Sequence, residues 1–241
     1  MDSFNPRKFI KTYSKSKNAC TLIILDWDDS LFPTSWSTRN NINLIDSQNR
    51  WRYVPIFKEL DNTLYNFLRK LKKYGKVIII TNAMTSWVYD SVSVLPKTSR
   101  IIKSIDIMSA RQLYQTEFND MMEWKKHTFK QAAKQIIDES VFAGYRHSLF
   151  ANGTAFAGSR CSLPANGKVV NIVSIGDAEY EYNALVDLDK WLPKNKKILK
   201  SIKLLSNPTQ NIIIDQLTVL NNAIPDICTI NSHLDWNFKR N

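Results

Sequence analysis

Two aspartates, Asp26 and Asp28, directly follow a run of apolar and β-branched residues and are the strongest candidates for chemistry in this sequence. The run, from Thr21 to Leu25, is typical of a buried strand in a parallel sheet. In open sheets of this kind, ligands bind just beyond the carboxyl ends of the strands. Carboxylates gathered there are costly unless a cation or a substrate compensates their charge. We therefore expect this strand end to belong to a functional site.

Other residues that could take part in chemistry also follow predicted strands or open a predicted helix. They are Thr81 and Asn82 after the run Val77–Ile80, Asp177 and Glu181 after the run Val169–Ile175, and Lys125 after Trp124 at the start of a helix. Because parallel strands end at one edge of a sheet, we expect the strand-end residues to meet there.

These segments, in this order, resemble the four motifs of the haloacid dehalogenase superfamily. The resemblance rests on Asp26-x-Asp28-x-Ser30, Thr81, Lys125 and Gly176-Asp177-x-x-x-Glu181, and it spans residues 20–181. Two positions depart from the usual pattern, with serine in place of threonine at 30 and glutamate in place of aspartate at 181. The Asp-Trp-Asp-Asp start and the Trp-Lys pair are most similar to a poorly characterised eukaryotic subgroup of that superfamily.

The resemblance implies a phosphatase that hydrolyses a phosphate monoester through an aspartyl-phosphate intermediate. Asp26 would be the nucleophile, and Asp28 would act first as general acid and then as general base. Thr81 and Lys125 would bind the phosphoryl group and stabilise its charge during the reaction. Asn82 is a further candidate for substrate binding. The phosphorylated substrate would be a small molecule or a phosphoprotein.

The resemblance also implies that Mg²⁺ is the cofactor. A phosphate dianion and a carboxylate repel one another, and a hard cation with oxygen ligands relieves that repulsion. Asp26 and Asp177 would supply side-chain oxygens and Asp28 its backbone carbonyl. Glu181, one helical turn beyond Asp177, would hold the ion through water.

Two of these assignments have close competitors in the sequence. Lys126 competes with Lys125, and we favour Lys125 because it directly follows Trp124. Glu179 competes with Glu181, and we favour Glu181 for its spacing.

Simpler explanations apply to several neighbouring residues. Asp29 is expected to point away from Asp26 and to cap the following turn. Ser30 is expected to hydrogen-bond backbone in that turn. Arg111 follows a strand end and could reach substrate. Trp27 and Trp36 are expected to pack in the core.

Strands and helices alternate along the chain, which predicts an α/β fold. The expected strands lie near 20–26, 77–80, 101–108, 168–175 and 200–205, and the expected helices near 55–74, 85–95, 110–114, 124–137, 208–221 and from 179 onward. Right-handed crossovers between them predict a three-layer, Rossmann-like sandwich with a mostly parallel sheet. Residues 31–55 leave little room for a cap, so the site would be open and would favour a bulky substrate such as a phosphoprotein or a nucleic-acid end.

The length of 241 residues predicts one hydrolase domain at 20–241, with an irregular segment at 140–168. The lysines and arginines that precede the first strand predict a basic N-terminal tail at 1–19. The net charge of +11 would attract anions, but no motif supports a nucleic-acid partner. No apolar run is long enough to span a membrane. The three cysteines lack disulfide or metal-ligand spacing, so we expect an intracellular protein, cytoplasmic or nuclear.

The alternative hypothesis is a catalytically vestigial protein of the same fold that binds an anionic partner, either nucleic acid or a phosphoprotein. The presence of Asp26, Asp28, Lys125 and Asp177 together favours the enzyme, because a decayed site usually loses a charged member. The sequence leaves the oligomeric state open.

Overall fold

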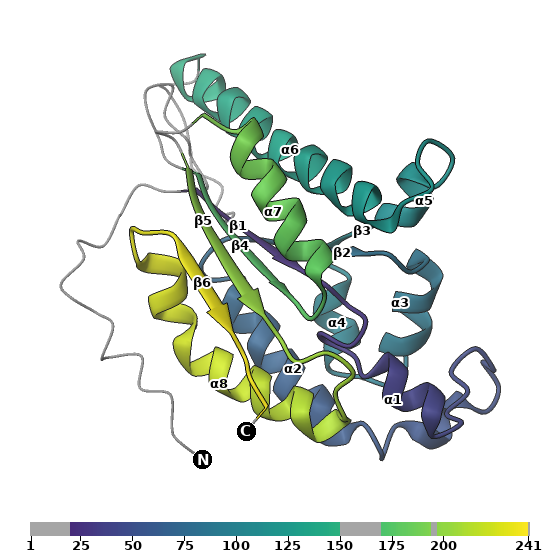
Figure 1. The fold of residues 1–241 in the computed structure, drawn as a ribbon. Coiled ribbons are helices and arrows are strands. Elements are labelled where there is room, and N and C mark those ends of the chain that lie inside the picture. The colour runs from purple at the N-terminus through teal and green to yellow at the C-terminus, as the bar shows by residue number, and fades with distance from the viewer. Residues whose placement is uncertain (1–19, 150–169, 194–196, 241) are drawn as a thin grey trace.

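The apolar runs of the sequence form the strands of one parallel sheet, seen in the computed structural model, which describes residues 20–149, 170–193 and 197–240 (Figure 1). The strands are β1 (Cys20–Leu25), β2 (Lys76–Thr81), β3 (Asp106–Ser109), β4 (Val170–Gly176), β5 (Lys197–Lys203) and β6 (Leu234–Asn237). They pair in the order β3-β2-β1-β4-β5-β6, and every pair is parallel. This arrangement puts β1 at the centre, between β2 and β4.

Helices cover both faces of the sheet (Figure 1). They are α1 (Thr34–Arg39), the short 3₁₀ helix η2 (Arg50–Tyr53), α2 (Lys58–Leu71), α3 (Thr85–Val92), α4 (Thr98–Ile102), α5 (Ala110–Tyr114), α6 (Met121–Leu149), α7 (Glu179–Trp191) and α8 (Gln210–Thr229). The prediction of an α/β, Rossmann-like sandwich with a mostly parallel sheet is confirmed.

The alternation of side chains along β1 divides the core into two layers. Ile23 and Leu25 belong to the larger layer, which packs against α2 and α8. Leu22 and Ile24 belong to the smaller layer, which packs against α6 and α7. The backbone N–H of Asp26 still bonds the carbonyl of Ile175 at 2.9 Å, so the ladder continues one residue beyond the strand. Asp26 therefore follows Leu22 and Ile24 toward the α6 and α7 side.

The strand predicted over 101–108 is wrong at its start, because residues Thr98–Ile102 form α4 and β3 begins only at Asp106. The carboxylate of Asp61 on α2 accepts the backbone N–H groups of Lys97 and Thr98 at 2.9 and 2.7 Å. That cap satisfies the first turn of a helix, a tertiary contact that hydropathy alone does not encode.

The irregular segment predicted at 140–168 is also corrected in part, since residues 140–149 continue α6 to Leu149. Residues 150–168 and the predicted basic tail at 1–19 lie outside the described residues. The strand β6 and the short helices α1 and η2 were not predicted. β6 is an edge strand whose residues alternate between partly buried and exposed, a weak signal in a sequence.

Within the described ranges, no helix is long and apolar enough to cross a bilayer. Only α1 and η2 precede α2 in the connection from β1 to β2, and only α3 and α4 lie between β2 and β3. The connections that follow these two strands therefore add no separate domain over the strand ends.

Candidate functional site

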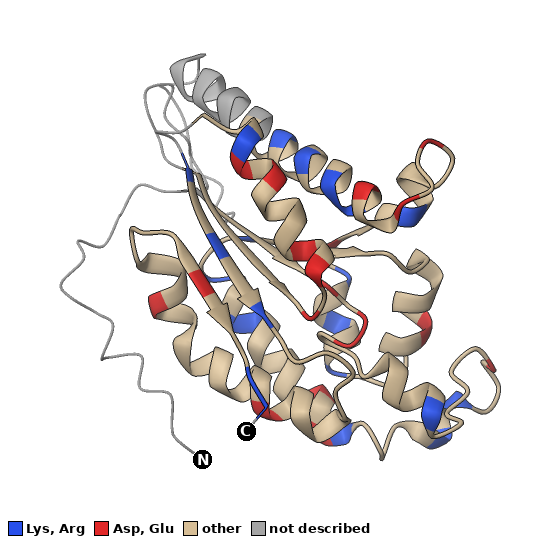
Figure 2. Ribbon diagram, in the orientation of Figure 1, with Lys and Arg blue, Asp and Glu red and all other residues tan. Residues whose placement is uncertain are grey.

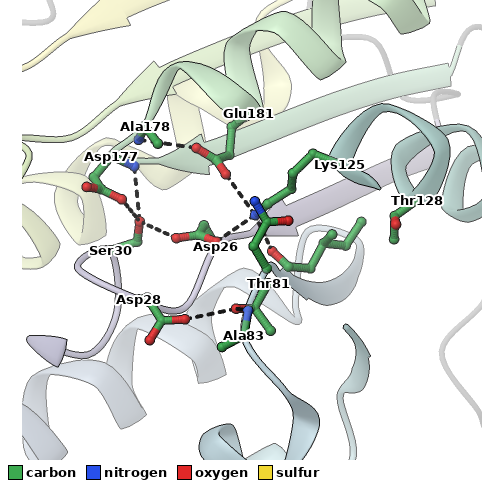
Figure 3. A network of polar contacts seen from close by, with 12 residues as sticks. Asp26, Asp28, Ser30, Thr81, Ala83, Lys125, Thr128, Asp177, Ala178 and Glu181 are labelled. Carbon is green, nitrogen blue, oxygen red and sulfur yellow. Dashed lines mark hydrogen bonds and ion pairs between the residues drawn. The ribbon is translucent and has the colours of Figure 1, made fainter. Parts of the chain in front are cut away.

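The candidate site lies at the carboxyl ends of the three central strands (Figure 3). Asp26 follows β1, Thr81 is the last residue of β2 and Asp177 follows β4. Because β1 pairs with both β2 and β4, these three residues lie on neighbouring strands. Figure 2 shows acidic residues concentrated at this edge, near the start of α7.

Lys125, on α6, forms an ion pair with Asp26 at the end of β1. Its Nζ lies 2.6 Å from Asp26 Oδ1, 2.7 Å from Glu181 Oε1 and 2.7 Å from the backbone carbonyl of Ile80 (Figure 3). An ammonium group has three donors, so all three are used. Burial lowers the pKa of Lys125, but the two carboxylates outweigh it, and the pKa is raised above its ordinary value. Lys125 is therefore a fixed cation.

The side chain of Glu181 lies directly against Gly176, and its carboxylate pairs with Lys125. A Cβ at Gly176 would lie 2.5 Å from Cγ of Glu181, closer than such atoms approach in proteins. The second carboxylate oxygen, Oε2, accepts the backbone N–H of Ala178 at 3.2 Å at the start of α7. The glycine of the Gly176-Asp177 pair is thus required by close approach.

Ser30 joins the two carboxylates that resemble metal ligands. Its Oγ lies 3.0 Å from Asp26 Oδ2 and 3.2 Å from Asp177 Oδ1, and it accepts the backbone N–H of Asp177 at 3.0 Å. A hydroxyl has one proton, so it donates to one carboxylate at a time. The prediction that Ser30 bonds backbone in its own turn is therefore wrong. The fully buried hydroxyl belongs to the site instead.

Burial and neighbouring carboxylates raise the pKa values of two aspartates of the site. Burial raises the pKa of Asp26 well above its usual range, Lys125 partly offsets this, and the nearby carboxylates add to the rise. Burial, together with Glu181 and Asp29, raises the pKa of Asp177 to about 7. Both shifts indicate a place where added positive charge would be stabilising.

Asp28 turns toward β2 and the helices beside it. Its Oδ2 accepts the Thr81 hydroxyl at 2.9 Å, and its Oδ1 accepts the Thr34 hydroxyl at 2.6 Å and the Trp87 indole N–H at 2.7 Å. Thr81 Oγ1 in turn accepts the backbone N–H of Ala83 at 2.9 Å. Neither Thr34 nor Trp87 was predicted from the sequence as a partner of Asp28. The position of Thr34, close after the Asp-Trp-Asp-Asp run, was the one feature of the sequence that could have indicated its contact with Asp28.

The competing lysine and glutamate lie outside the cluster. Lys126 pairs with Glu123 on the same helix at 2.6 Å. Glu179 is exposed and pairs with Lys203. Both favoured residues, Lys125 and Glu181, are the ones that the structure brings to Asp26.

Asp29, Asn82 and Arg111 have other contacts. Asp29 adopts a left-handed conformation, with φ of 54°, and accepts the backbone N–H of Ser35 in the first turn of α1 at 2.9 Å, as the predicted cap requires. Asn82 donates to the carbonyl of Met121 at 3.5 Å. Arg111 bonds Gln115 on its own helix at 3.1 Å.

The oxygen atoms at this edge that could contribute to binding a cation are those of Asp26, Asp177 and the backbone carbonyl of Asp28. Asp26 and Asp177 share the Ser30 hydroxyl, and no described residue donates to the backbone carbonyl of Asp28. Mg²⁺ is commonly held by one or two carboxylates, with water and phosphate completing its shell. In the described part of the chain, no three or more His, Cys, Asp or Glu side chains form a metal-binding group. A cation here would therefore rely on backbone and external oxygens as well.

Comparison with protein-family models, curated proteins and solved structures finds no significant match to this chain.

Proposed function

We propose that this protein is a Mg²⁺-dependent phosphatase that hydrolyses phosphate monoesters through an aspartyl-phosphate on Asp26. The observation that supports this best is the contact between Asp26 and Lys125, with Asp28 and Asp177 at the same edge. A buried carboxylate fixed by a lysine at a strand end is a positioned nucleophile. An ordinary core would fill such a place with apolar side chains.

In the proposed first step, an oxygen of Asp26 forms a bond to phosphorus as the ester oxygen leaves. Lys125 already holds Asp26 in place. The Thr81 hydroxyl, which bonds Asp28 in the free protein, would turn toward a phosphoryl oxygen. Asp28 gives its proton to the leaving oxygen. In the second step, Asp28 takes a proton from the water that releases phosphate and restores the Asp26 carboxylate.

Charge explains why the proposal includes a divalent cation. The carboxylates of Asp28, Asp177 and Glu181 raise the pKa of Asp26, and the one ammonium group among them in the described residues, that of Lys125, pairs with Asp26 and Glu181. A phosphate dianion would be repelled from such a place. Asp26, Asp177 and the Asp28 carbonyl would hold Mg²⁺, with Glu181 reaching it through water, and the bound ion would supply the missing positive charge.

The contacts of Glu181 refine its proposed part. One of its oxygens bonds Lys125 and the other bonds the N–H of Ala178. It acts foremost as the second anchor of Lys125. A water-mediated contact to the ion would use the remaining lone pairs of its oxygens.

The test is hydrolysis of 4-nitrophenyl phosphate and of a panel of phosphorylated metabolites and phosphopeptides, with Mg²⁺ and with excess chelator. We expect turnover only with a hard divalent ion. Full activity in chelator would overturn the role of the metal. Absence of turnover on every substrate, with salt-dependent binding to nucleic acid or phosphopeptides, would favour the vestigial binding protein instead.

A further inference from the structure

The hydrogen bonds to Asp28 are divided unequally between its two carboxylate oxygens. From the described residues, Oδ1 accepts both the Thr34 hydroxyl and the Trp87 indole N–H, whereas Oδ2 accepts only the Thr81 hydroxyl. A carboxylate offers about four lone-pair positions, two on each oxygen. Oδ1 is therefore fully used, and Oδ2 keeps one position open.

The two donors to Oδ1 are anchored in the same part of the core. Trp87 packs edge-on against the ring of Phe32, with centroids 6.2 Å apart and planes at 82°. The backbone N–H of Thr34 bonds the carbonyl of Phe32 at 2.9 Å. Phe32 is fully buried, so the ring of Trp87 and the backbone of Thr34 are both held against the packed core.

The donor to Oδ2 differs, because the proposed function gives it a second partner. Thr81 has one hydroxyl proton, and it cannot bond a phosphoryl oxygen and Asp28 Oδ2 at once. When the hydroxyl turns to the phosphoryl group, Oδ2 loses its only donor. Phosphate binding would thus free Oδ2 and leave Oδ1 held.

We propose that Trp87 and Thr34 are positioning residues that lock Oδ1 of Asp28, so that Oδ2 alone exchanges protons during the reaction. This inference rests on the proposed function. The proton on Oδ2 passes to the ester oxygen as its bond to phosphorus breaks and that oxygen keeps the electron pair. In the second step a water proton returns to Oδ2 while the water oxygen bonds phosphorus and the electrons of the Asp26–phosphorus bond return to Asp26.

The test compares two substrates in Trp87→Phe, which removes the N–H donor and keeps an aromatic ring. Kinetics are measured with an alkyl phosphate, whose leaving group needs a proton, and with 4-nitrophenyl phosphate, whose leaving group does not. Losing one hydrogen bond to a charged group should lower kcat for the alkyl phosphate roughly 10-fold to 100-fold. We expect little change for 4-nitrophenyl phosphate, and the same split in Thr34→Val.

Trp36→Phe is the matched control. Trp36 is a partly buried tryptophan that packs edge-on against Phe57, and it is not among the described residues that donate to Asp28. We expect no dependence on leaving group in this variant. In an Asp28→Asn background, Trp87→Phe should leave the ratio between the two substrates unchanged, because the group that it positions is already disabled.

A readout that needs no turnover tests the contact between Trp87 and Asp28 by itself. The indole N–H signal of Trp87, identified by its loss in Trp87→Phe, should move in the NMR spectrum of Asp28→Asn, whose amide is a weaker acceptor than a carboxylate. An unmoved signal would overturn the contact itself.

The kinetic outcomes are equally distinct. If the wild-type protein hydrolyses no phosphate monoester of the panel, the proposed function fails and the positioning role fails with it, whatever the NMR signal shows. If the wild-type protein is active but kcat falls equally for both substrates in Trp87→Phe and Thr34→Val, the positioning role alone is overturned. Should Trp87→Phe not fold, Thr34→Val decides between these outcomes.

Discussion

Glu181 lies over Gly176 so closely that any side chain at position 176 would collide with it, at 2.5 Å from Cγ. The same carboxylate holds Lys125 at 2.7 Å, and Lys125 holds Asp26 at 2.6 Å. Because Gly176 on β4 has no side chain, Glu181 can lie beside it and pair with Lys125. Lys125 in turn pairs with Asp26, the proposed nucleophile at the end of β1, and fixes its orientation. Gly176 therefore has a structural role in the site and takes no part in the proposed reaction.

Gly176→Ala should therefore displace Glu181 and destabilise the protein by about 1–3 kcal/mol, the usual cost of overpacking a core. Urea denaturation of the wild type and the variant measures this cost. In a Glu181→Ala background the collision is gone, so the added cost of Gly176→Ala should shrink. An undiminished cost in that background would mean that the backbone at 176, and not Glu181, resists the substitution.

Asp26→Asn should abolish turnover and leave the fold intact, because a carboxamide does not attack phosphorus. Binding of beryllium fluoride, which mimics an aspartyl-phosphate, should be lost in the same variant. Circular dichroism controls for folding. Near wild-type turnover in Asp26→Asn would remove Asp26 as the nucleophile.

Lys125→Ala should cost far more than Lys126→Ala. Lys125 is buried between two carboxylates, and its removal should lower stability by about 3–5 kcal/mol, as for a broken buried ion pair. Turnover should fall on the order of 10²–10³-fold with the loss of this preorganised contact. Lys126 forms one surface pair with Glu123, a contact of about 0–1 kcal/mol. Equal losses in the two variants would contradict the placement of Lys125.

The metal-free protein should become less stable as the pH rises through neutrality. The pKa of Asp177 is raised from 3.8 to about 7, so between these values the folded state binds more protons than the unfolded state. Stability from this group is complete below its ordinary pKa and is lost as the pH rises through the raised one. The pKa of Asp26, raised mainly by burial, acts in the same direction.

Thermal melts in chelator, from about pH 5 to about pH 8, measure this slope. Asp177→Asn, which cannot titrate, should flatten it. Mg²⁺ should raise the melting temperature more at pH 8 than at pH 5, because metal binding needs deprotonated carboxylates. A slope unchanged in Asp177→Asn would assign the titration to another group.

The sequence by itself determined where the three central strands of the sheet end and which reactive side chains follow them. Apolar runs that stop at Asp26, Thr81 and Asp177 predict buried parallel strands, because a central strand must be apolar on both faces. Helix geometry lets only one of Lys125 and Lys126 face the strand ends, since adjacent residues point about 100° apart. The resemblance favoured Lys125, which directly follows Trp124. These are local properties of the chain, and local patterns carry them.

Only the tertiary structure decided what those side chains bond to. Ser30 meets Asp177 across 147 positions of sequence, and Trp87 meets Asp28 across 59. Nothing local marks either pair, because a serine or a tryptophan bonds whichever acceptor the packed core brings within about 3 Å. The same holds for Asp61, whose carboxylate caps α4, the helix that ends where the sequence predicted a strand to begin. Hydrogen-bond partners depend on how the layers pack, and hydropathy patterns do not record that packing.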